Sequence, residues 1–470
     1  MPSPRTRSRP ASRRSKEPNQ MKTRTMLRTM FFAPLIAACA FAADWPQYYG
    51  PKRDATSAEK GILRTWPKEG PKVLWTAPVG IGFGGAAVSA GKVYLLDRDD
   101  KAGDTLRVYE LSSGKELWNF AYAAPGKVEF PGSRTTPTVD GDRVYTVGMV
   151  GDLYCFNAAT QKPLWHKNIW TDFGGGAAVP ASPFAPAAEG GQLPIWGIVQ
   201  NPLIYRNLLI VASQAPQAGL VAYDKATGEI KWKTAPLAPA NARPSPLNAG
   251  TSYVSPSVVK VGAEDHLVMI TASQGFGRAS SGGTTNGIDP LTGKLLWTYT
   301  GFNCWIPVAH AVDAGQGRML LAGGYNAGST MIQVAKKDDG TYAVTELFKS
   351  RDFGSHTQPP LLYKDHFYAQ FTTNERRDGL VSMSMSGEVK WKTGQEPAFI
   401  RGGAILVDDV LIATDGRQKL YLIEPDPAGF KPLASAELME AGNNWAPLAL
   451  SNGKLLIRDQ KKLIAIQVAE

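Results

Sequence analysis

Aromatic and hydrogen-bonding side chains recur one to three residues before prolines spaced along the chain, and one arginine precedes a Gly-Gly pair. Arginine binds carboxylates through paired N–H groups, and tryptophan faces stack on flat rings. If the fold gathers these residues, they predict a site for a small planar anion. The candidate ligand-binding residues are Arg134, Asn201, Tyr253, Trp305, His356, Gln358, Arg401, Asn444 and Trp445.

The elements that must position these residues are β-hairpins, which repeat along the chain. Residues 224–232 and 289–297 share one order: Asp, Thr three residues later, then Gly, and Trp four residues after that. The Asp and Thr side chains can bond the N–H groups of the turn, and Gly supplies its positive φ. Strand alternation then turns the Trp toward the buried face. We expect blade-docking roles for Trp75, Trp118, Trp165, Trp232, Trp297 and Trp391.

Each of these hairpins follows another hairpin, typically of the form Gly-Lys/Asp-x-Val-Tyr, and eight such first hairpins are present. Two hairpins make a four-stranded antiparallel blade of a propeller. The last of these first hairpins lies near Asn452, and the chain ends before the outer strand of its blade. A matching strand occurs around Trp75. The sequence therefore predicts an all-β, eight-bladed β-propeller that is closed circularly by the strand near Trp75, which leaves no open edge.

In such a ring, the innermost strand of each blade begins at one rim of the channel, and proline suits the first residue of a strand. The nine candidate residues would then surround the channel mouth. Two interpretations stay open. In the first, the nine residues bind a ligand, which is a quinone, a glycan or a peptide. In the second, they only plug the channel and satisfy buried backbone groups. Segment 174–193, rich in Gly, Ala and Pro, is expected to act as a lid or partner contact.

The N-terminal region is typical of an upstream extension followed by a secretory signal. Its apolar stretch, residues 30–43, is too short to span a membrane and ends in an Ala-x-Ala pattern. A competing lipoprotein pattern would place a lipid anchor at Cys39. We expect an exported protein, periplasmic or extracellular. The alternative is an outer-membrane lipoprotein. The predicted parts are 1–42 (extension and signal), 43–72 (lead-in) and 73–470 (propeller).

The chain's formal charge of +10 belongs mostly to its first residues. Residues 1–30 hold nine basic residues and one acidic residue, so residues 31–470 carry only +2. Phosphate binding needs a concentrated basic surface, which argues against a nucleic-acid partner. We predict no metal site, since the five histidines lack ligand spacing.

Three smaller expectations concern polar residues of the body. The acid-rich segment 97–104 is expected to be a solvated hairpin loop, and His266 and His366 are expected in exposed turns. Cys155 and Cys304 are expected to be buried free thiols, with a single disulfide as the alternative.

The repeat resembles the PQQ-like β-propeller repeat of the quinoprotein alcohol dehydrogenase-like superfamily. Residues 45–51 (Trp-Pro-Gln-Tyr-Tyr-Gly-Pro), 130–137 and 151–155 are similar to exported members of that group. The resemblance implies two alternatives. Quinoprotein dehydrogenases bind PQQ and Ca²⁺ over the channel with a catalytic Asp and an adjacent Cys-Cys disulfide, whereas the outer-membrane assembly lipoprotein BamB is a non-enzymatic scaffold. This chain departs from the first pattern, because Cys155 and Cys304 are 149 residues apart.

The sequence therefore favours an exported, non-enzymatic binding or scaffold module of the cell envelope, with no catalytic residue assigned. Its expected partner is an envelope protein or a small anionic or planar ligand. The alternative is a PQQ-dependent oxidoreductase of alcohols or sugars, with PQQ and Ca²⁺ at a ring of Arg134, Trp305 and Trp445. A third hypothesis, a lectin-like or polysaccharide-associated module, has no residue in its favour.

Overall fold

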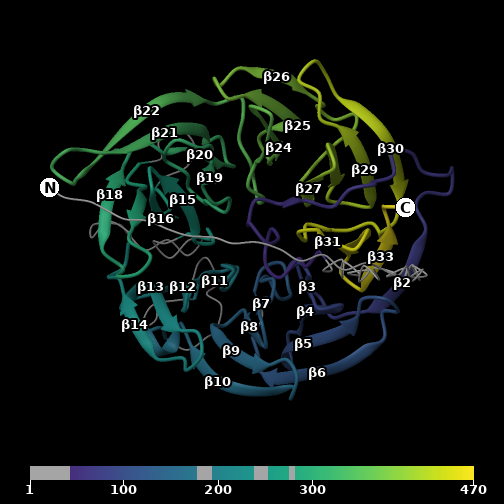
Figure 1. The fold of residues 1–470 in the computed structure, drawn as a ribbon, viewed down its shortest axis with the longest axis horizontal. Helices are drawn as coiled ribbons and strands as arrows, with labels where there is room; N and C mark the ends of the chain where they lie inside the picture. The colour runs from purple at the N-terminus through teal and green to yellow at the C-terminus, as the bar shows by residue number, and fades with distance from the viewer. Residues whose placement is uncertain (1–42, 127, 177–192, 238–251, 275–280) are drawn as a thin grey trace, which may run out of the picture. The chain divides into compact units, whose positions relative to one another are not determined.

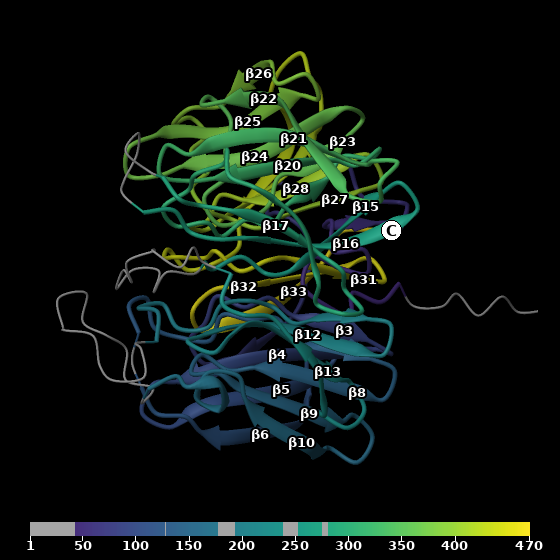
Figure 2. The same ribbon diagram turned by 90° about the vertical axis from the view of Figure 1, so that its left-hand side faces the viewer.

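The computed structural model describes residues 43–126, 128–176, 193–237, 252–274 and 281–470. Eight sheets of four antiparallel strands form a ring around a central channel, which confirms the predicted eight-bladed β-propeller (Figure 1). Figure 2 turns this ring to its side, with the blue strands β4–β10 and the green strands β20–β26 at opposite ends of the view.

The first four blades run from their inner to their outer strand in sequence order. Their strands are β3 (Ala87–Ser89), β4 (Lys92–Asp99), β5 (Gly103–Glu110) and β6 (Glu116–Ala123) in blade 1; β7 (Thr138–Asp140), β8 (Arg143–Val147), β9 (Asp152–Asn157) and β10 (Lys162–Asn168) in blade 2; β11 (Leu203–Tyr205), β12 (Leu208–Ala215), β13 (Ala218–Asp224) and β14 (Ile230–Lys233) in blade 3; and β15 (Ser257–Val261), β16 (Glu264–Ile270), β17 (Thr285–Ile288) and β18 (Leu295–Tyr299) in blade 4. A short 3₁₀ helix, η1 (Thr171–Phe173), follows β10.

The remaining blades complete the ring. Their strands are β19 (Val312–Asp313), β20 (Arg318–Gly323), β21 (Gly328–Lys336) and β22 (Tyr342–Ser350) in blade 5; β23 (Leu361–Tyr363), β24 (His366–Thr372), β25 (Arg377–Ser384) and β26 (Val389–Lys392) in blade 6; β27 (Ala404–Val407), β28 (Val410–Thr414), β29 (Lys419–Glu424) and β30 (Lys431–Glu437) in blade 7; and β31 (Ala449–Ser451), β32 (Lys454–Arg458), β33 (Lys462–Gln467) and β2 (Val73–Pro78) in blade 8.

Blade 8 joins the two ends of the propeller. Strand β2 pairs antiparallel with β33, and Trp75 faces Ala465 in that register. The indole Nε1–H of Trp75 donates to the carbonyl of Leu111 in blade 1 at 2.9 Å. One aromatic residue thus belongs to the closing strand and also contacts the first blade.

The repeated aromatic residue packs on the turn glycine of the next blade. A Cβ placed on Gly114 would lie 2.5 Å from Trp75, and on Gly293 2.6 Å from Trp232. Phe348 holds this position in blade 5, below Gly387 of blade 6. Trp165 packs on Gly228 in the same way, while Trp391 donates to the Asp426 carbonyl. Of the six tryptophans predicted to dock blades, the remaining two are Trp118 and Trp297. Both are buried, and Trp297 donates to His266.

The turn glycines give a direct test of this packing. Gly262 and Gly293 both have positive φ and lie in blade 4, but only Gly293 is covered by an indole. We expect Gly262→Ala to cost about 1–2 kcal/mol of unfolding free energy from backbone strain. Gly293→Ala should cost a further ~1–3 kcal/mol because its Cβ overpacks against Trp232. Urea unfolding of the two variants measures the difference, and equal losses would contradict indole-on-glycine docking.

The segment that precedes β2 fills the channel, a role that the sequence pattern did not indicate. Trp45 bridges to Val88 of β3, and the Pro46 carbonyl accepts from the Val139 N–H. Further along, β1 (Thr56–Ser57) pairs in parallel with β27. Figure 1 shows this segment in purple near the centre of the ring.

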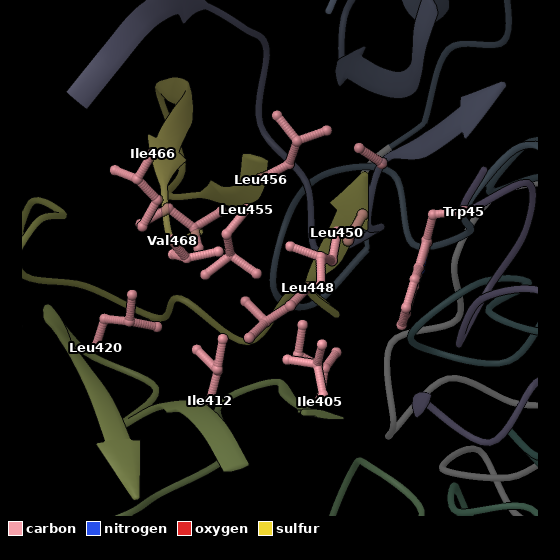
Figure 3. Packing of buried hydrophobic residues seen from close by; sticks show 14 of the residues in the cluster. Trp45, Ile405, Ile412, Leu420, Leu448, Leu450, Leu455, Leu456, Ile466 and Val468 are labelled. Carbon is pink, nitrogen blue, oxygen red and sulfur yellow. The ribbon is translucent and has the colours of Figure 1, made fainter. Parts of the chain in front are cut away.

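Apolar side chains fix the segment in place. Trp45 is buried with aliphatic residues of blades 7 and 8, among them Ile405, Leu448 and Leu450 (Figure 3). At the face that carries the inner hairpin turns, Asp44 bonds Ser89 and Ala90, and Glu59 bonds the N–H of Gly453. The segment therefore enters the channel from the face of the inner hairpin turns.

Three expectations about polar residues have mixed outcomes. The hairpin loop expected over 97–104 is confirmed only at its turn, where residues 99–102 reach solvent; Asp97 and Asp104 are buried, and Arg98 Nη1 lies 3.1 Å from Asp104 Oδ1. The exposed turn expected for His266 is also wrong: the residue lies buried in β16, and its Nδ1 accepts the Trp297 indole N–H at 2.9 Å. Cys155 and Cys304 are buried free thiols, as expected. No helix in the described residues is long and apolar enough to cross a membrane.

Candidate functional site

One mouth of the channel opens into a pocket of about 350 Å³. Its walls come from connections between successive blades and from turns on the same face, and Tyr48 of the N-terminal segment also lines it. Since that segment enters from the opposite face and fills the channel, the pocket is closed below.

The structure brings seven of the nine predicted residues together in this pocket. The reason is the one used for the prediction: each lies just before an inner strand, where the chain returns to the channel rim. The seven are Arg134, Asn201, Tyr253, His356, Gln358, Arg401 and Trp445.

The two other predicted residues do not line the pocket. Trp305 packs edge-on against Tyr325, and its neighbour Ile306 takes the lining position. Asn444 is buried and turned away from the mouth, since its Nδ2 donates to the carbonyls of Arg417 and Glu440. Proximity to a proline places a residue near the rim but does not set the side-chain direction.

Arg401 is a cation of the pocket, and two contacts hold its guanidinium in place. Its guanidinium lies 4.8 Å from the ring centre of Trp445, and its Nε donates to His356 Nδ1 at 2.8 Å. Within the described residues, neither Nη atom of Arg401 has a hydrogen-bond partner. Two parallel N–H groups are therefore left for a carboxylate, the geometry that arginine binds best.

His356 orients that arginine. Because Nδ1 accepts a hydrogen bond from the Nε–H of Arg401, the histidine is neutral and carries its own proton on Nε2. The contact of Nδ1 with the Thr372 carbonyl at 3.2 Å is then no hydrogen bond, since both atoms are acceptors. Burial, together with the nearby Arg401 charge, lowers the pKa of His356 to about 3.

Arg134 is the second cation of the pocket. Its Nε donates to the Trp196 carbonyl at 2.8 Å, and its Nη2 donates to the carbonyls of Glu129 and Phe130. Burial lowers the pKa of Arg134 to about 10, so it stays charged at neutral pH. Its Nη1 has no hydrogen-bond partner in the described part of the chain.

The amide side chains that the sequence analysis singled out act as braces. Asn201 accepts the Thr136 N–H at 2.7 Å and donates to Ser255 Oγ at 3.1 Å. Gln358 accepts from the Tyr49 hydroxyl and donates to the Trp445 carbonyl at 2.8 Å. Their hydrogen-bonding groups are engaged within the protein, which favours a structural role over ligand recognition.

Below the pocket, the N-terminal segment makes an aromatic and basic layer. The rings of Tyr48 and Tyr49 lie 5.9 and 5.7 Å from that of His310, and Arg53 donates to the carbonyls of Pro202 and Pro256. Burial, helped by the Arg53 charge, lowers the pKa of His310 to about 3.

These two buried histidines predict acid lability. In the unfolded chain a histidine has a pKa of about 6.5, so it takes up a proton below that pH while folded His310 and His356 stay neutral. Their contribution to stability is thus complete above pH 6.5 and is lost as the pH falls toward 3. At pH 5 the loss should be about 2 kcal/mol for each histidine.

Denaturant unfolding at pH 7 and pH 5 tests this expectation. His310→Gln and His356→Gln should each reduce the pH-dependent loss by about 2 kcal/mol, because glutamine does not titrate. His366→Gln, at the start of β24 and away from the channel pocket, controls for the substitution of a histidine by glutamine as such. An unchanged pH dependence in both axial variants would contradict the neutral histidines.

Two aromatic residues that the sequence analysis missed adopt strained backbone conformations at the rim. Phe130 has φ 57° and Tyr325 φ 51°, in the left-handed region that bulky residues rarely occupy. The Phe130 ring lies 5.4 Å from Trp445, and the Tyr325 ring lies 4.9 Å from His356. Such strain costs ~1–3 kcal/mol per residue and persists where surrounding contacts impose it, often at ligand sites.

Comparisons with known proteins agree with this architecture. A family model described as outer membrane protein assembly factor BamB matches residues 102–300. Among solved structures, BamB from Moraxella catarrhalis gives a TM-score of 0.53 at 14% identity, covering 84% of this chain and 99% of that chain. A europium-containing methanol dehydrogenase gives 0.61 at 13% identity, covering 90% and 89%.

The chain is a PQQ-like β-propeller. A quinohemoprotein alcohol dehydrogenase from Comamonas testosteroni is also similar, with a TM-score of 0.59 at 12% identity over 91% of this chain and 81% of that chain. No curated protein sequence matched. At such identities these structures share the fold, and the chemistry of this PQQ-like propeller has to be argued from its own pocket.

The pocket of this PQQ-like propeller suits a planar anion better than a cation. Ca²⁺ takes six to eight oxygen ligands, several of them carboxylates. The carboxylate in the described lining is Glu129, which is exposed, whereas two guanidinium groups, Arg134 and Arg401, stand in the same pocket. The described residues contain no cluster of three or more acidic, His or Cys side chains that could hold a metal ion. PQQ, a planar polycarboxylate, fits the arginines; the Ca²⁺ that accompanies it in quinoproteins does not fit this donor set.

Proposed function

We propose that this protein is an exported binding module of the cell envelope, which captures a small planar anion at the mouth of its closed channel and performs no reaction on it. The observation that carries the proposal is the Arg401 guanidinium, with both Nη groups unbonded within the described residues and its plane against Trp445. Arg134 supplies a second cation in the same pocket.

The state of His356 supports binding over proton transfer. A general base works best when its pKa lies near the operating pH. His356 lines the pocket, but its Nδ1 lone pair accepts from Arg401 and its pKa is lowered to about 3. It therefore serves as a positioning residue for Arg401 and is a poor proton acceptor.

Export and attachment are part of the same proposal. The signal-like stretch, the Ala-x-Ala pattern and the lipoprotein pattern at Cys39 all lie outside the described residues. Partial similarity to the BamB model supports an envelope location with a protein partner on one face. Fractionation of cells expressing the parent protein and Cys39→Ser tests both points, because loss of membrane association in the variant indicates a lipid anchor and retention excludes it.

A PQQ-dependent oxidoreductase is the second candidate, favoured by the structural likeness to alcohol and methanol dehydrogenases. When bound, PQQ would supply the redox chemistry, and Arg134 and Arg401 would hold its carboxylates. This candidate requires oxidation of an alcohol or sugar by the loaded protein, which the binding proposal does not.

Thermal shift measurements separate the two candidates. A ligand that binds only the folded state raises the melting temperature. We expect PQQ and smaller aromatic dicarboxylates to raise it without added Ca²⁺, and neutral aromatic alcohols to leave it unchanged. Dye-linked oxidation of an alcohol or sugar by the PQQ-loaded protein would overturn the non-enzymatic proposal. An unchanged melting temperature with every planar anion would exclude the ligand site.

A further inference from the structure

A second cavity, of about 220 Å³, lies away from the channel between blades 4 and 5. It is bounded by the connection that follows β18, by the β20–β21 turn and by the end of β22. None of its lining residues belongs to the axial pocket. The side chains used below are those of Phe302, Asn303, Asn326, Ser329, Lys349 and Arg351.

The hydroxyl of Ser329 indicates that this cavity binds a ligand. The residue is only 1% exposed, and its Oγ has no hydrogen-bond partner among the described residues. A buried hydroxyl without a partner costs free energy, so such groups usually have one that is not part of the chain. Because Ser329 lines the cavity, a hydroxylated ligand there would supply the missing hydrogen bond.

Two amide side chains add neutral hydrogen-bonding groups. Asn303 accepts the Gly283 N–H through Oδ1 at 3.0 Å, and its Nδ2 donates to no group in the part of the chain that the structure describes. Asn326 follows Tyr325 in the β20–β21 turn, with φ 61°. Beneath them, the buried Phe302 offers an apolar surface. Neutral donors and acceptors around an apolar base match the alternating hydroxyl and C–H groups of a sugar.

Arg351 gives the cavity its charge. Within the described residues it forms no ion pair, whereas Lys349 is neutralised by Glu346, whose Oε2 lies 2.8 Å from its Nζ. The backbone of Arg351 is held in place, since Arg376 Nη1 donates to its carbonyl at 2.9 Å. An unpaired guanidinium beside several neutral polar groups selects a carboxylate carried on a polyhydroxylated ring.

We propose that this cavity is a binding site for an acidic monosaccharide unit, a uronate, on the rim between blades 4 and 5. The carboxylate lies on Arg351, one hydroxyl bonds Ser329 Oγ, and the amides of Asn303 and Asn326 bond the remaining hydroxyls. The site is separate from the axial pocket and does not depend on its ligand. It gives the lectin-like hypothesis the residues that the sequence analysis lacked.

Titration of the full-length protein with glucuronate, followed by calorimetry or ligand-observed NMR, tests the proposal. Glucuronate should bind at millimolar concentration, and glucose and acetate should bind at least about tenfold more weakly, since each lacks one half of the recognised chemistry. Arg351→Gln should reduce glucuronate binding to the level of glucose. Arg206→Gln, on the opposite hairpin face of blade 3, is the matched control and should bind as the parent does.

Ser329→Ala adds a readout that a purely structural role would not give. Because the hydroxyl has no partner among the described residues, its removal should leave the melting temperature unchanged or raise it, while glucuronate binding weakens about tenfold. Ser257→Ala removes another buried hydroxyl without a partner in the described residues, outside both pockets, and should leave binding unchanged.

Several outcomes would overturn the site. Glucuronate that does not bind, or that binds equally well to Arg351→Gln and Ser329→Ala, excludes it. Acetate that binds as tightly as glucuronate shows a simple anion site. Arg401→Gln should keep glucuronate binding, so loss of binding in that variant would place the sugar in the axial pocket instead.

Discussion

Replacing Trp75 by alanine should lower the free energy of unfolding by about 3–5 kcal/mol, the range for truncating a large buried aromatic side chain. Trp75 is 8% exposed, packs on Gly114 and donates to the Leu111 carbonyl at 2.9 Å. Its strand, β2, also closes the ring by pairing with β33. Weakening that strand exposes an edge of β33 to other chains. Urea unfolding and size-exclusion chromatography measure both effects.

Trp118→Ala is the matched control for ring closure. Trp118 is also 8% exposed, but it lies within the continuous chain of blade 1 and its Nε1 has no hydrogen-bond partner in the described residues. Trp118→Ala should lower the free energy of unfolding by about 1 kcal/mol less than Trp75→Ala does, because it removes one hydrogen bond fewer. It should yield no oligomers. If Trp75→Ala stays monomeric and loses no more stability than Trp118→Ala, closure by β2 does not have the role assigned to it.

Arg401→Gln should weaken binding of planar dicarboxylates, including PQQ, by about 30-fold or more, since truncating one partner of a buried charged pair costs at least ~2 kcal/mol. The substitution removes both Nη groups and the contact with Trp445 while keeping an uncharged polar side chain. Isothermal titration of the variant against the parent protein measures the loss.

Three further variants make this expectation specific. Arg377→Gln changes an exposed arginine of blade 6 and should leave the affinity unchanged. His356→Phe removes the acceptor that orients Arg401 and should weaken binding, whereas His356→Gln keeps an acceptor and should restore most of it. Equal affinity in the parent protein, Arg401→Gln and His356→Phe would remove Arg401 from the site.

The local rules of β-hairpins explain why the blade repeat could be predicted from the sequence. The Asp224 carboxylate bonds the N–H groups of Ala226 and Thr227, and Gly228 has φ 72°, as the motif requires. These contacts span at most a few residues. Even the substitution of Phe348 for Trp is visible in sequence, because spacing along the chain fixes its register against Gly387.

The pocket could be predicted only in part. Closing eight blades brings the starts of the inner strands to one rim, so Arg134, His356 and Arg401 meet although they lie far apart in the chain. Side-chain direction at the rim depends on neighbours from other blades. Trp445 lines the pocket beside Phe83 and Phe130, while Trp305, also placed two residues before a proline, does not line it.

Spacing and residue type thus determined the strands, their turns and the count of blades, since a hairpin is stabilised by contacts between residues near in sequence. Only the tertiary structure decided the floor of the pocket and the charge state of its histidines. Tyr49 bonds Gln358, 309 residues away, and the burial of His310 and His356 depends on that packing. Desolvation and long-range contacts are properties of the closed ring, and no local pattern encodes them.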